Sequence, residues 1–192
     1  MLNWLKALLA VLAVRRPKPA PPAATPIATP IRPAPTPPRT VSKIAIAAGS
    51  AIAIAVAFVA PFEGYSGKVY RDEVGVKTIC YGQTAADGAD FSKIYTKAEC
   101  EEMLGRDLKK YQAELRPCVP KEQPPHREAA LISFAYNLGP HALCGPVGRY
   151  INAGNITAGC NAMLAYNHAG GRVLPGLTRR RQAERAMCLR ND

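Results

Sequence analysis

Proline content divides the chain into a part that cannot build a core and a part that can. Ten of the 22 residues from Pro17 to Pro38 are proline, which lacks the backbone N–H that helices and sheets use. Such a segment buries too little apolar surface to offset the entropy lost on ordering. We therefore expect residues 1–43 to be a disordered arm and the later residues of this 192-residue chain to form one compact domain.

The net charge of +11 is concentrated in that arm. Residues 1–43 hold seven of the 25 basic side chains and no acid, which leaves 18 basic against 14 acidic side chains, a net charge of +4, for the rest. A basic segment directly before an apolar run is typical of the cytoplasmic flank of a membrane helix, and only secondarily of a nucleic-acid-binding arm. The distribution of charge thus predicts no nucleic-acid partner.

The apolar run comprises the nineteen uncharged residues from Ile44 to Phe62, eight of them alanine. This length is just enough to span a bilayer as a helix. The strongly apolar side chains contribute about −4 kcal/mol to insertion, which Gly49, Ser50 and Pro61 partly offset, so insertion is expected to be marginal. We interpret the run as an inner-membrane helix that exports the residues on its C-terminal side, with a strand or a buried core helix as the alternatives.

The six cysteines all lie after the apolar run, and none forms a Cys-x-x-Cys pair. No His-Glu-x-x-His occurs, and the three histidines (His126, His141 and His168) lack the spacing of metal ligands, so we expect no metal. An even number of cysteines confined to an exported segment favours disulfides formed in the periplasm, with free thiols as the alternative. The sequence order alone leaves 15 connectivities open. The candidates are Cys80, Cys100, Cys118, Cys144, Cys160 and Cys188.

Hydrophobic periodicity predicts a small sheet followed by helices, hence an α+β fold. Residues 69–82 alternate and are broken by glycines, which favours three short antiparallel strands. A capping box, Thr96 with Glu99, opens a helix that Pro117 ends. Further helices are expected over residues 127–138, 157–166 and 178–189.

The residues with the clearest chemical meaning are Glu63, Asp72 and Thr78, in the order Glu-x8-Asp-x5-Thr. Two carboxyl groups and a hydroxyl that orients water are what hydrolysis of a glycosidic bond requires. The alternative is that both acids are solvated surface groups and that Thr78 is an ordinary strand residue.

Four further blocks accompany this motif, and together they resemble the phage lysozymes of the T-even type, the family-24 glycoside hydrolases. The resemblance runs from about Phe62 to the C-terminus, with Gln83 in a place where the T-even form has histidine. It implies a lysozyme-like fold and hydrolysis, by a monomer without a cofactor, of the β-1,4 bond between N-acetylmuramic acid and N-acetylglucosamine in peptidoglycan. The blocks are residues 134–139, residues 152–155 with Cys160, residues 169–171, and residues 175–181 with Glu184 and Arg185.

The resemblance also implies a role for each candidate. Glu63 is expected to be the general acid, and Asp72 the opposite carboxylate that holds a water together with Thr78. Inversion is implied, for which the carboxyl groups lie roughly 6.5–9.5 Å apart. The cluster of Arg179–Arg181 with Arg185 is expected either to bind an anionic wall polymer or to supply a partner for Glu63, the alternative being a solvated helix face.

The apolar run resembles the signal-anchor-release segment of endolysins from lambdoid phages. This implies an arm (1–43), an anchor (44–62) and a catalytic domain (63–192), held inactive at the inner membrane and later released to the periplasm for host lysis. Resemblance and sequence order together favour the pairs Cys80–Cys100, Cys118–Cys144 and Cys160–Cys188, the second of which looks like an added pair.

Two other functions remain open. The chain is alternatively a membrane-tethered peptidoglycan-binding module without catalysis, or a basic protein that binds nucleic acid or disrupts membranes through residues 1–43. Neither alternative explains the spacing of Glu63, Asp72 and Thr78.

Overall fold

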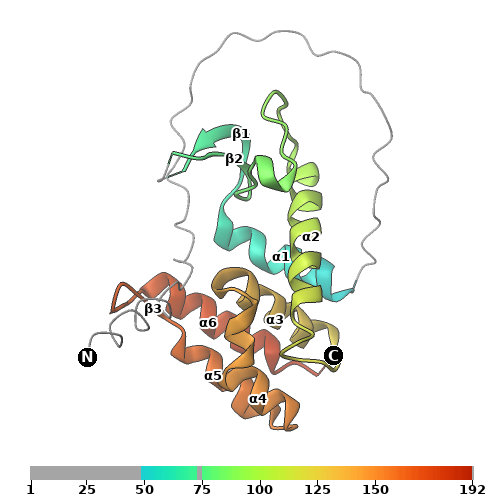
Figure 1. Cartoon of the computed structure of the whole chain (residues 1–192), viewed down its shortest axis with the longest axis vertical. Coiled ribbons are helices and arrows are strands. Elements are labelled where there is room, and N and C mark those ends of the chain that lie inside the picture. The colour runs from blue at the N-terminus through green and yellow to red at the C-terminus, as the bar shows by residue number, and fades with distance from the viewer. Residues whose placement is uncertain (1–48, 73–74, 192) are drawn as a thin grey trace, which may run out of the picture. The chain divides into compact units, whose positions relative to one another are not determined.

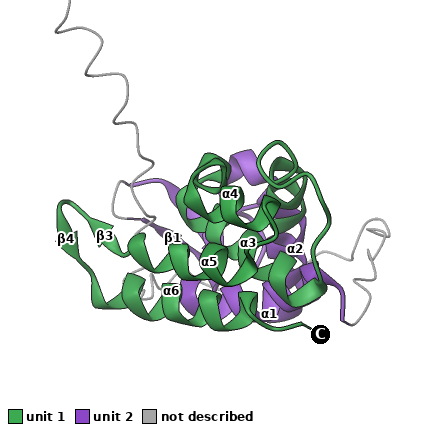
Figure 2. Ribbon diagram, turned by 90° about the horizontal axis from the view of Figure 1, so that it is seen from below, with its two compact units in different colours: residues 1–19, 108–192 green, residues 20–107 purple. Residues whose placement is uncertain are grey.

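The computed structural model describes residues 49–72 and 75–191 (Figure 1). They belong to two compact units, which are numbered here in chain order (Figure 2). The described residues of the first lie within 49–107 (purple, unit 2 in the key of Figure 2), those of the second lie within 108–191 (green, unit 1 in the key), and the boundary falls inside helix α2. The first unit contains α1 (Ala51–Glu63), β1 (Ser66–Arg71), β2 (Lys77–Cys80), the 3-10 helix η1 (Ala85–Asp87) and most of α2 (Lys97–Glu114). The second contains α3 (Pro125–Leu138), η2 (Pro140–Cys144), α4 (Pro146–Asn152), α5 (Ile156–Ala162), η3 (Met163–Ala165), β3 (His168–Ala169), β4 (Arg172–Val173) and α6 (Pro175–Cys188). The predicted α+β class is confirmed.

Helix α1 is formed by the second part of the apolar run. It begins where the Ser50 Oγ accepts a hydrogen bond from the backbone N–H of Ala53, at 3.2 Å. It ends at Glu63, because Gly64 adopts a φ of +72°, a conformation that a helix cannot continue through. Ile52, Ala55 and Val59, spaced as one helical stripe, are buried in the folded protein. In this part of the run the structure therefore has a core helix, which was one of the alternatives.

Within the described residues, no helix is long and apolar enough to cross a membrane. The predicted anchor also includes residues 44–48, which lie outside the described residues, as does the arm over residues 1–43. The anchor therefore stays a prediction.

The sheet of the first unit is smaller than expected. Strands β1 and β2 pair antiparallel, with Tyr70 opposite Thr78 and an irregularity on the Ser66 side. Instead of a third strand, the described residues have one isolated bridge, Ile79 to Gln83, closed by a backbone hydrogen bond of 2.9 Å from the Gln83 N–H to the Ile79 carbonyl. The chain turns at Tyr81 and Gly82, directly after β2, so the segment predicted as three strands ends in a turn and not in a third strand.

The four predicted helices are confirmed, with shifted ends. Helix α2 starts after a true capping box, in which the Thr96 N–H donates to Glu99 at 2.8 Å and the Glu99 N–H donates to the Thr96 hydroxyl at 3.3 Å. Helices α3 and α6 begin two and three residues earlier than expected, because Pro125 and Pro175 fit the first helical turn. Helix α4 and the hairpin of β3 with β4 were not predicted, since elements of seven and two residues give no measurable periodicity.

A buried cluster of charges joins α3 to α6 in the second unit. Glu184, fully buried, accepts hydrogen bonds from the Ser133 hydroxyl at 2.7 Å, from Arg180 Nε at 3.2 Å and from Arg181 Nη2 at 3.0 Å. Burial lowers the pKa of Arg181 to about 10, although Glu184 opposes that shift. Burial raises the pKa of Glu184, against the attraction of both arginines. Buried charges of this kind are stable only when they are paired, because an unpaired buried ion costs several kcal/mol of folding free energy.

Three disulfides connect the cysteines as the resemblance implied: Cys80 with Cys100, Cys118 with Cys144, and Cys160 with Cys188. The first ties the end of β2 to the first turn of α2, and the last ties α5 to the end of α6. Closed loops of this size typically stabilise a domain by about 2–4 kcal/mol each.

Cys80 has a φ of +59°, the one positive φ among the described residues that are not glycine. A side chain in this conformation costs about 1–2 kcal/mol, and the bond to Cys100 holds it there. We predict that the double variant Cys80→Gly with Cys100→Ala will be more stable than Cys80→Ala with Cys100→Ala by about 1 kcal/mol, because only glycine relaxes the backbone. Urea unfolding of the two variants at neutral pH measures the difference. Equal stability, or a more stable alanine variant, would contradict strain at this position.

Candidate active site

The candidate site residues Glu63, Asp72 and Thr78 lie in the first unit, on α1 and on the hairpin after it. Glu63 is the last residue of α1 and is only 9% exposed, although it is ionisable. Acidic side chains are seldom this buried unless they are paired or have a functional role. The carboxyl group is thus attached to a helix end with a defined position and is largely shielded from bulk water.

Asp72 lies in the turn between β1 and β2. Its Oδ1 accepts a hydrogen bond of 2.8 Å from the Val76 N–H, and its own N–H donates to the Val76 carbonyl at 3.0 Å. Arg71 also stabilises the turn, because its Nη1 donates a hydrogen bond of 2.6 Å to the Gly75 carbonyl. Because backbone groups hold both the main chain and one carboxylate oxygen of Asp72, the turn fixes the orientation of that side chain.

Thr78 lies on β2 and is completely buried. Its hydroxyl donates to the Val76 carbonyl at 3.1 Å. The hydroxyl proton is therefore committed to the backbone, while the lone pairs of Oγ1 can accept a hydrogen bond from water. Val76 consequently connects the two candidates, since its N–H holds Asp72 and its carbonyl holds Thr78.

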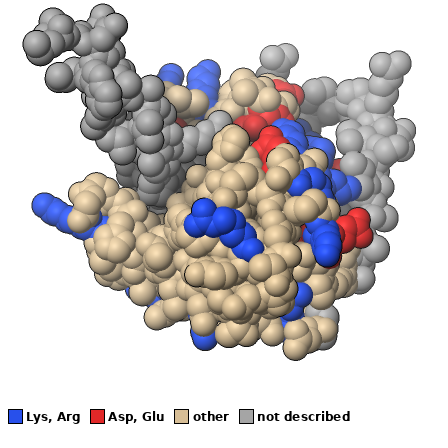
Figure 3. Space-filling model, turned by 60° about the horizontal axis from the view of Figure 1, so that its bottom comes forward, with Lys and Arg blue, Asp and Glu red and all other residues tan. Residues whose placement is uncertain are grey.

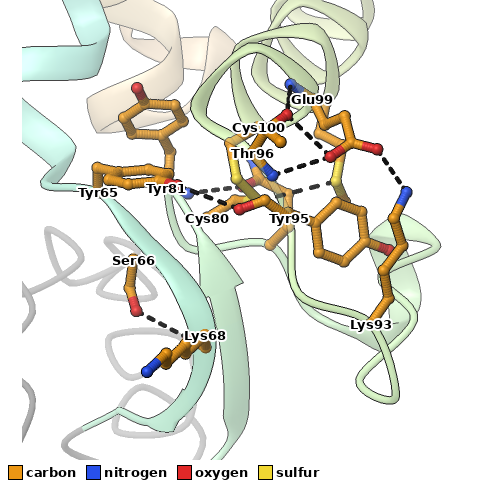
Figure 4. The surroundings of a disulfide bond; sticks show 12 residues. Tyr65, Ser66, Lys68, Cys80, Tyr81, Lys93, Tyr95, Thr96, Glu99 and Cys100 are labelled. Atoms are coloured by element: carbon orange, nitrogen blue, oxygen red, sulfur yellow. Dashed lines mark hydrogen bonds and ion pairs between the residues drawn. A yellow bond between two sulfur atoms is a disulfide. The ribbon is translucent and has the colours of Figure 1, made fainter. Parts of the chain in front are cut away.

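The hairpin is fixed to the start of α2 by more than the disulfide (Figure 4). The Tyr95 N–H donates to the Gly67 carbonyl at 3.0 Å, and the Tyr65 hydroxyl donates to the Tyr95 carbonyl at 3.1 Å. Gly67 is required for this approach, because a Cβ there would lie 2.5 Å from the Tyr95 carbonyl oxygen. Lys93 reinforces the same end by pairing with Glu99 at 2.6 Å. The disulfide and these hydrogen bonds thus hold the end of the hairpin that lies opposite to the Asp72 turn.

The arginine cluster expected to bind an anionic polymer is divided by the structure. Arg180 and Arg181 are buried and pair with Glu184, whereas Arg179 is exposed and Arg185 donates to Asn161 at 2.6 Å. The alternative of a solvated helix face is therefore wrong for Arg180 and Arg181, and their burial also removes them from a surface that could bind a polymer. Figure 3 shows one face of the molecule, on which Lys and Arg stand in several groups while Asp and Glu gather toward one side.

Sequence reasoning missed Tyr70, Arg71 and Gly75, which shape the surroundings of Asp72. The usable signal for Tyr70 was its place two residues before Asp72, since alternate residues of a strand share a face.

Among the described residues, no group of three His, Cys, Asp or Glu side chains has the arrangement of a metal site.

Comparison with known proteins gives consistent matches. The family model described as phage lysozyme matches residues 60–184. The SAR-endolysin of bacteriophage PS119 is 38% identical over 155 residues, which cover 77% of this chain and 92% of that protein. The SAR-endolysin of enterobacteria phage P21 is 38% identical over 148 residues, which cover 73% and 89%. Among solved structures, a variant of P22 lysozyme is similar with a TM-score of 0.64 and 28% identity, over 71% of this chain and 95% of that one.

The turn that carries Asp72 provides a matched test, because Gly75 and Gly88 have nearly the same φ, +82° and +81°, with open space where a Cβ would lie. Alanine at either position costs about 1 kcal/mol of backbone strain. We predict that Gly75→Ala will lower the rate of peptidoglycan cleavage at least about 5-fold by shifting Asp72, whereas Gly88→Ala will leave it unchanged. Cleavage rates and melting temperatures of both variants check this. Equal rates at equal stability would mean that the turn does not position a reacting group.

Proposed function

Because the chain belongs to the phage lysozyme family, we propose that Glu63, Asp72 and Thr78 are the catalytic residues of a lysozyme. The protein is a glycosidase that acts on peptidoglycan. We assign the cleavage to the β-1,4 bond between N-acetylmuramic acid and N-acetylglucosamine. One observation supports the choice of these three catalytic residues. The helix α1 ends on the shielded Glu63, and in the hairpin that follows, Val76 binds both Asp72 and Thr78.

The chemistry is set by the surroundings of each group. Glu63 donates its proton to the glycosidic oxygen as the bond from that oxygen to the sugar C1 breaks. Asp72, held by the Val76 N–H, stabilises the positive charge that develops on the sugar and takes a proton from the attacking water. Thr78 accepts a hydrogen bond from that water, because its own proton is engaged by the Val76 carbonyl. Water then adds to C1 from the face opposite to the leaving group, which inverts the configuration.

The first test replaces Glu63 by glutamine. An amide of the same shape cannot donate the required proton, so we predict that Glu63→Gln lowers cleavage of purified peptidoglycan by at least about 100-fold. Glu114→Gln, an exposed acid on α2, is the control and should retain full activity. A turbidity assay measures cleavage, and circular dichroism verifies that both variants are folded.

The same pair of variants separates the alternatives. A peptidoglycan-binding module without catalysis would produce no cleavage even from the unmodified protein. If Glu63→Gln instead keeps more than a few per cent of the wild-type rate, the protein cleaves peptidoglycan but Glu63 is not its general acid.

We further propose that residues 44–62 anchor the exported enzyme in the inner membrane and keep it inactive until release. The SAR-endolysin names of the relatives from PS119 and P21 motivate this proposal. In the folded protein Ile52, Ala55 and Val59 are buried, and Glu63 comes after them without a linker. A helix cannot place these side chains in lipid and in the protein at once. Membrane insertion of α1 therefore excludes the folded arrangement around Glu63 and delays lysis of the host.

The anchor is tested on the side of α1 that is not buried, so that the core and the Ser50 cap stay intact. Replacing Ala53, Ala57 and Ala60 by leucine favours lipid, whereas glutamine at the same positions, with a similar size, favours water. We predict that the leucine variant stays in the membrane fraction and lyses cells later than wild type. The glutamine variant should not be retained there. A leucine variant that lyses as early as wild type while it remains in the membrane would refute control by anchor release.

A further inference from the structure

Tyr70 shares a face of the β1–β2 hairpin with Thr78, one of the proposed catalytic residues. It lies directly opposite Thr78 in the β1–β2 register, and residues opposite each other in an antiparallel pair point to the same side. It also lies two positions before Asp72, which opens the turn directly after β1. The pairing thus places Tyr70 and Thr78 on one face of the hairpin, next to the turn that holds Asp72, although Tyr70 does not belong to the sequence motif.

The carboxylates of the candidate site act electrostatically on Tyr70. Partial burial raises the pKa of Tyr70 above its usual value, and the negative charges of Asp72 and then Glu63 raise it further. The phenol is therefore neutral at pH 7 and keeps its O–H as a hydrogen-bond donor. The influence of both carboxylates on Tyr70 agrees with the strand register, which places its ring on the face that carries Thr78.

The geometry points to Tyr70 as a substrate-contacting residue, whose hydroxyl donates a hydrogen bond to the sugar bound between Glu63 and Asp72. This inference rests on the proposed function. A neutral phenol suits the position because it adds a donor without changing the local charge. A lysine there would instead form an ion pair with the two carboxylates and compete with their roles.

The test removes only the hydroxyl, by Tyr70→Phe, and measures binding apart from catalysis. In the Glu63→Gln background, the dissociation constant for soluble peptidoglycan fragments should rise about 3- to 10-fold, the size expected for one neutral hydrogen bond. With Glu63 present, kcat/KM should fall by a similar factor, mainly through KM, because the bond is made in the ground state and in the transition state alike.

Tyr150→Phe is the matched control. Tyr150 is an exposed tyrosine on α4 that takes no part in holding the hairpin, so removal of its hydroxyl should leave glycan affinity unchanged. Tyr70→His, assayed at alkaline pH so that the imidazole stays neutral beside the carboxylates and keeps one ring N–H donor, should lose less affinity than Tyr70→Phe. A structural role for the ring predicts the opposite order, since phenylalanine preserves the ring better than histidine does.

The outcomes separate this inference from the catalytic assignment. A change in affinity of less than 3-fold for Tyr70→Phe, an equal loss in Tyr150→Phe, or a greater loss in Tyr70→His than in Tyr70→Phe overturns the role of Tyr70. If Tyr70→Phe weakens binding while Glu63→Gln keeps its cleavage activity, the contact stands and the role of Glu63 is wrong.

Discussion

The register of β1 against β2 is the constraint on which the candidate site depends. Tyr70 lies opposite Thr78, and the turn beyond them is short enough for Val76 to bind both Asp72 and Thr78. A slip of one residue would move every side chain of one strand to the other face of the hairpin and separate these groups. A two-stranded sheet is only marginally stable by itself. The disulfide from Cys80 to Cys100 and the contacts of Tyr95 with Gly67 explain how so small a sheet holds a fixed register.

The apolar side chains of helix α1 pack in the core of the folded protein, and the proposed anchor would place the same side chains in the membrane. Its apolar residues are buried in the fold, where the spacing of Ile52, Ala55 and Val59 forms a stripe, and its last residue is Glu63. The remaining positions carry mainly alanine, phenylalanine and proline, so the helix has no polar face of the kind a surface helix usually presents. This composition is the physical reason why a sequence pattern alone could not separate a core helix from a membrane helix.

The second unit uses buried charge to join two helices. Glu184 on α6 binds Ser133 on α3 and both adjacent arginines, and Arg181 also donates to Asn137 at 2.8 Å. Two guanidinium groups around one carboxylate require fixed geometry, because each loses its water and only directed hydrogen bonds replace it. The Arg181 guanidinium also lies 5.0 Å from the centre of the Phe134 ring, which adds a cation–π contact.

The sequence by itself determined the features that depend on neighbours along the chain. The capping box of Thr96 and Glu99, the end of α3 at Gly139 and the α+β order arise from local hydrogen bonding and periodicity. The motif of Glu63, Asp72 and Thr78 and the cysteine pairs came from spacing and resemblance. Tertiary structure decided the rest. An arginine such as Arg181 has the same local preferences on a solvated face as in a core, and only the position of Glu184 between α3 and α6 buries it. Tyr70 is likewise brought opposite Thr78 by the pairing of β1 with β2, and the sequence of one strand does not encode its register with another.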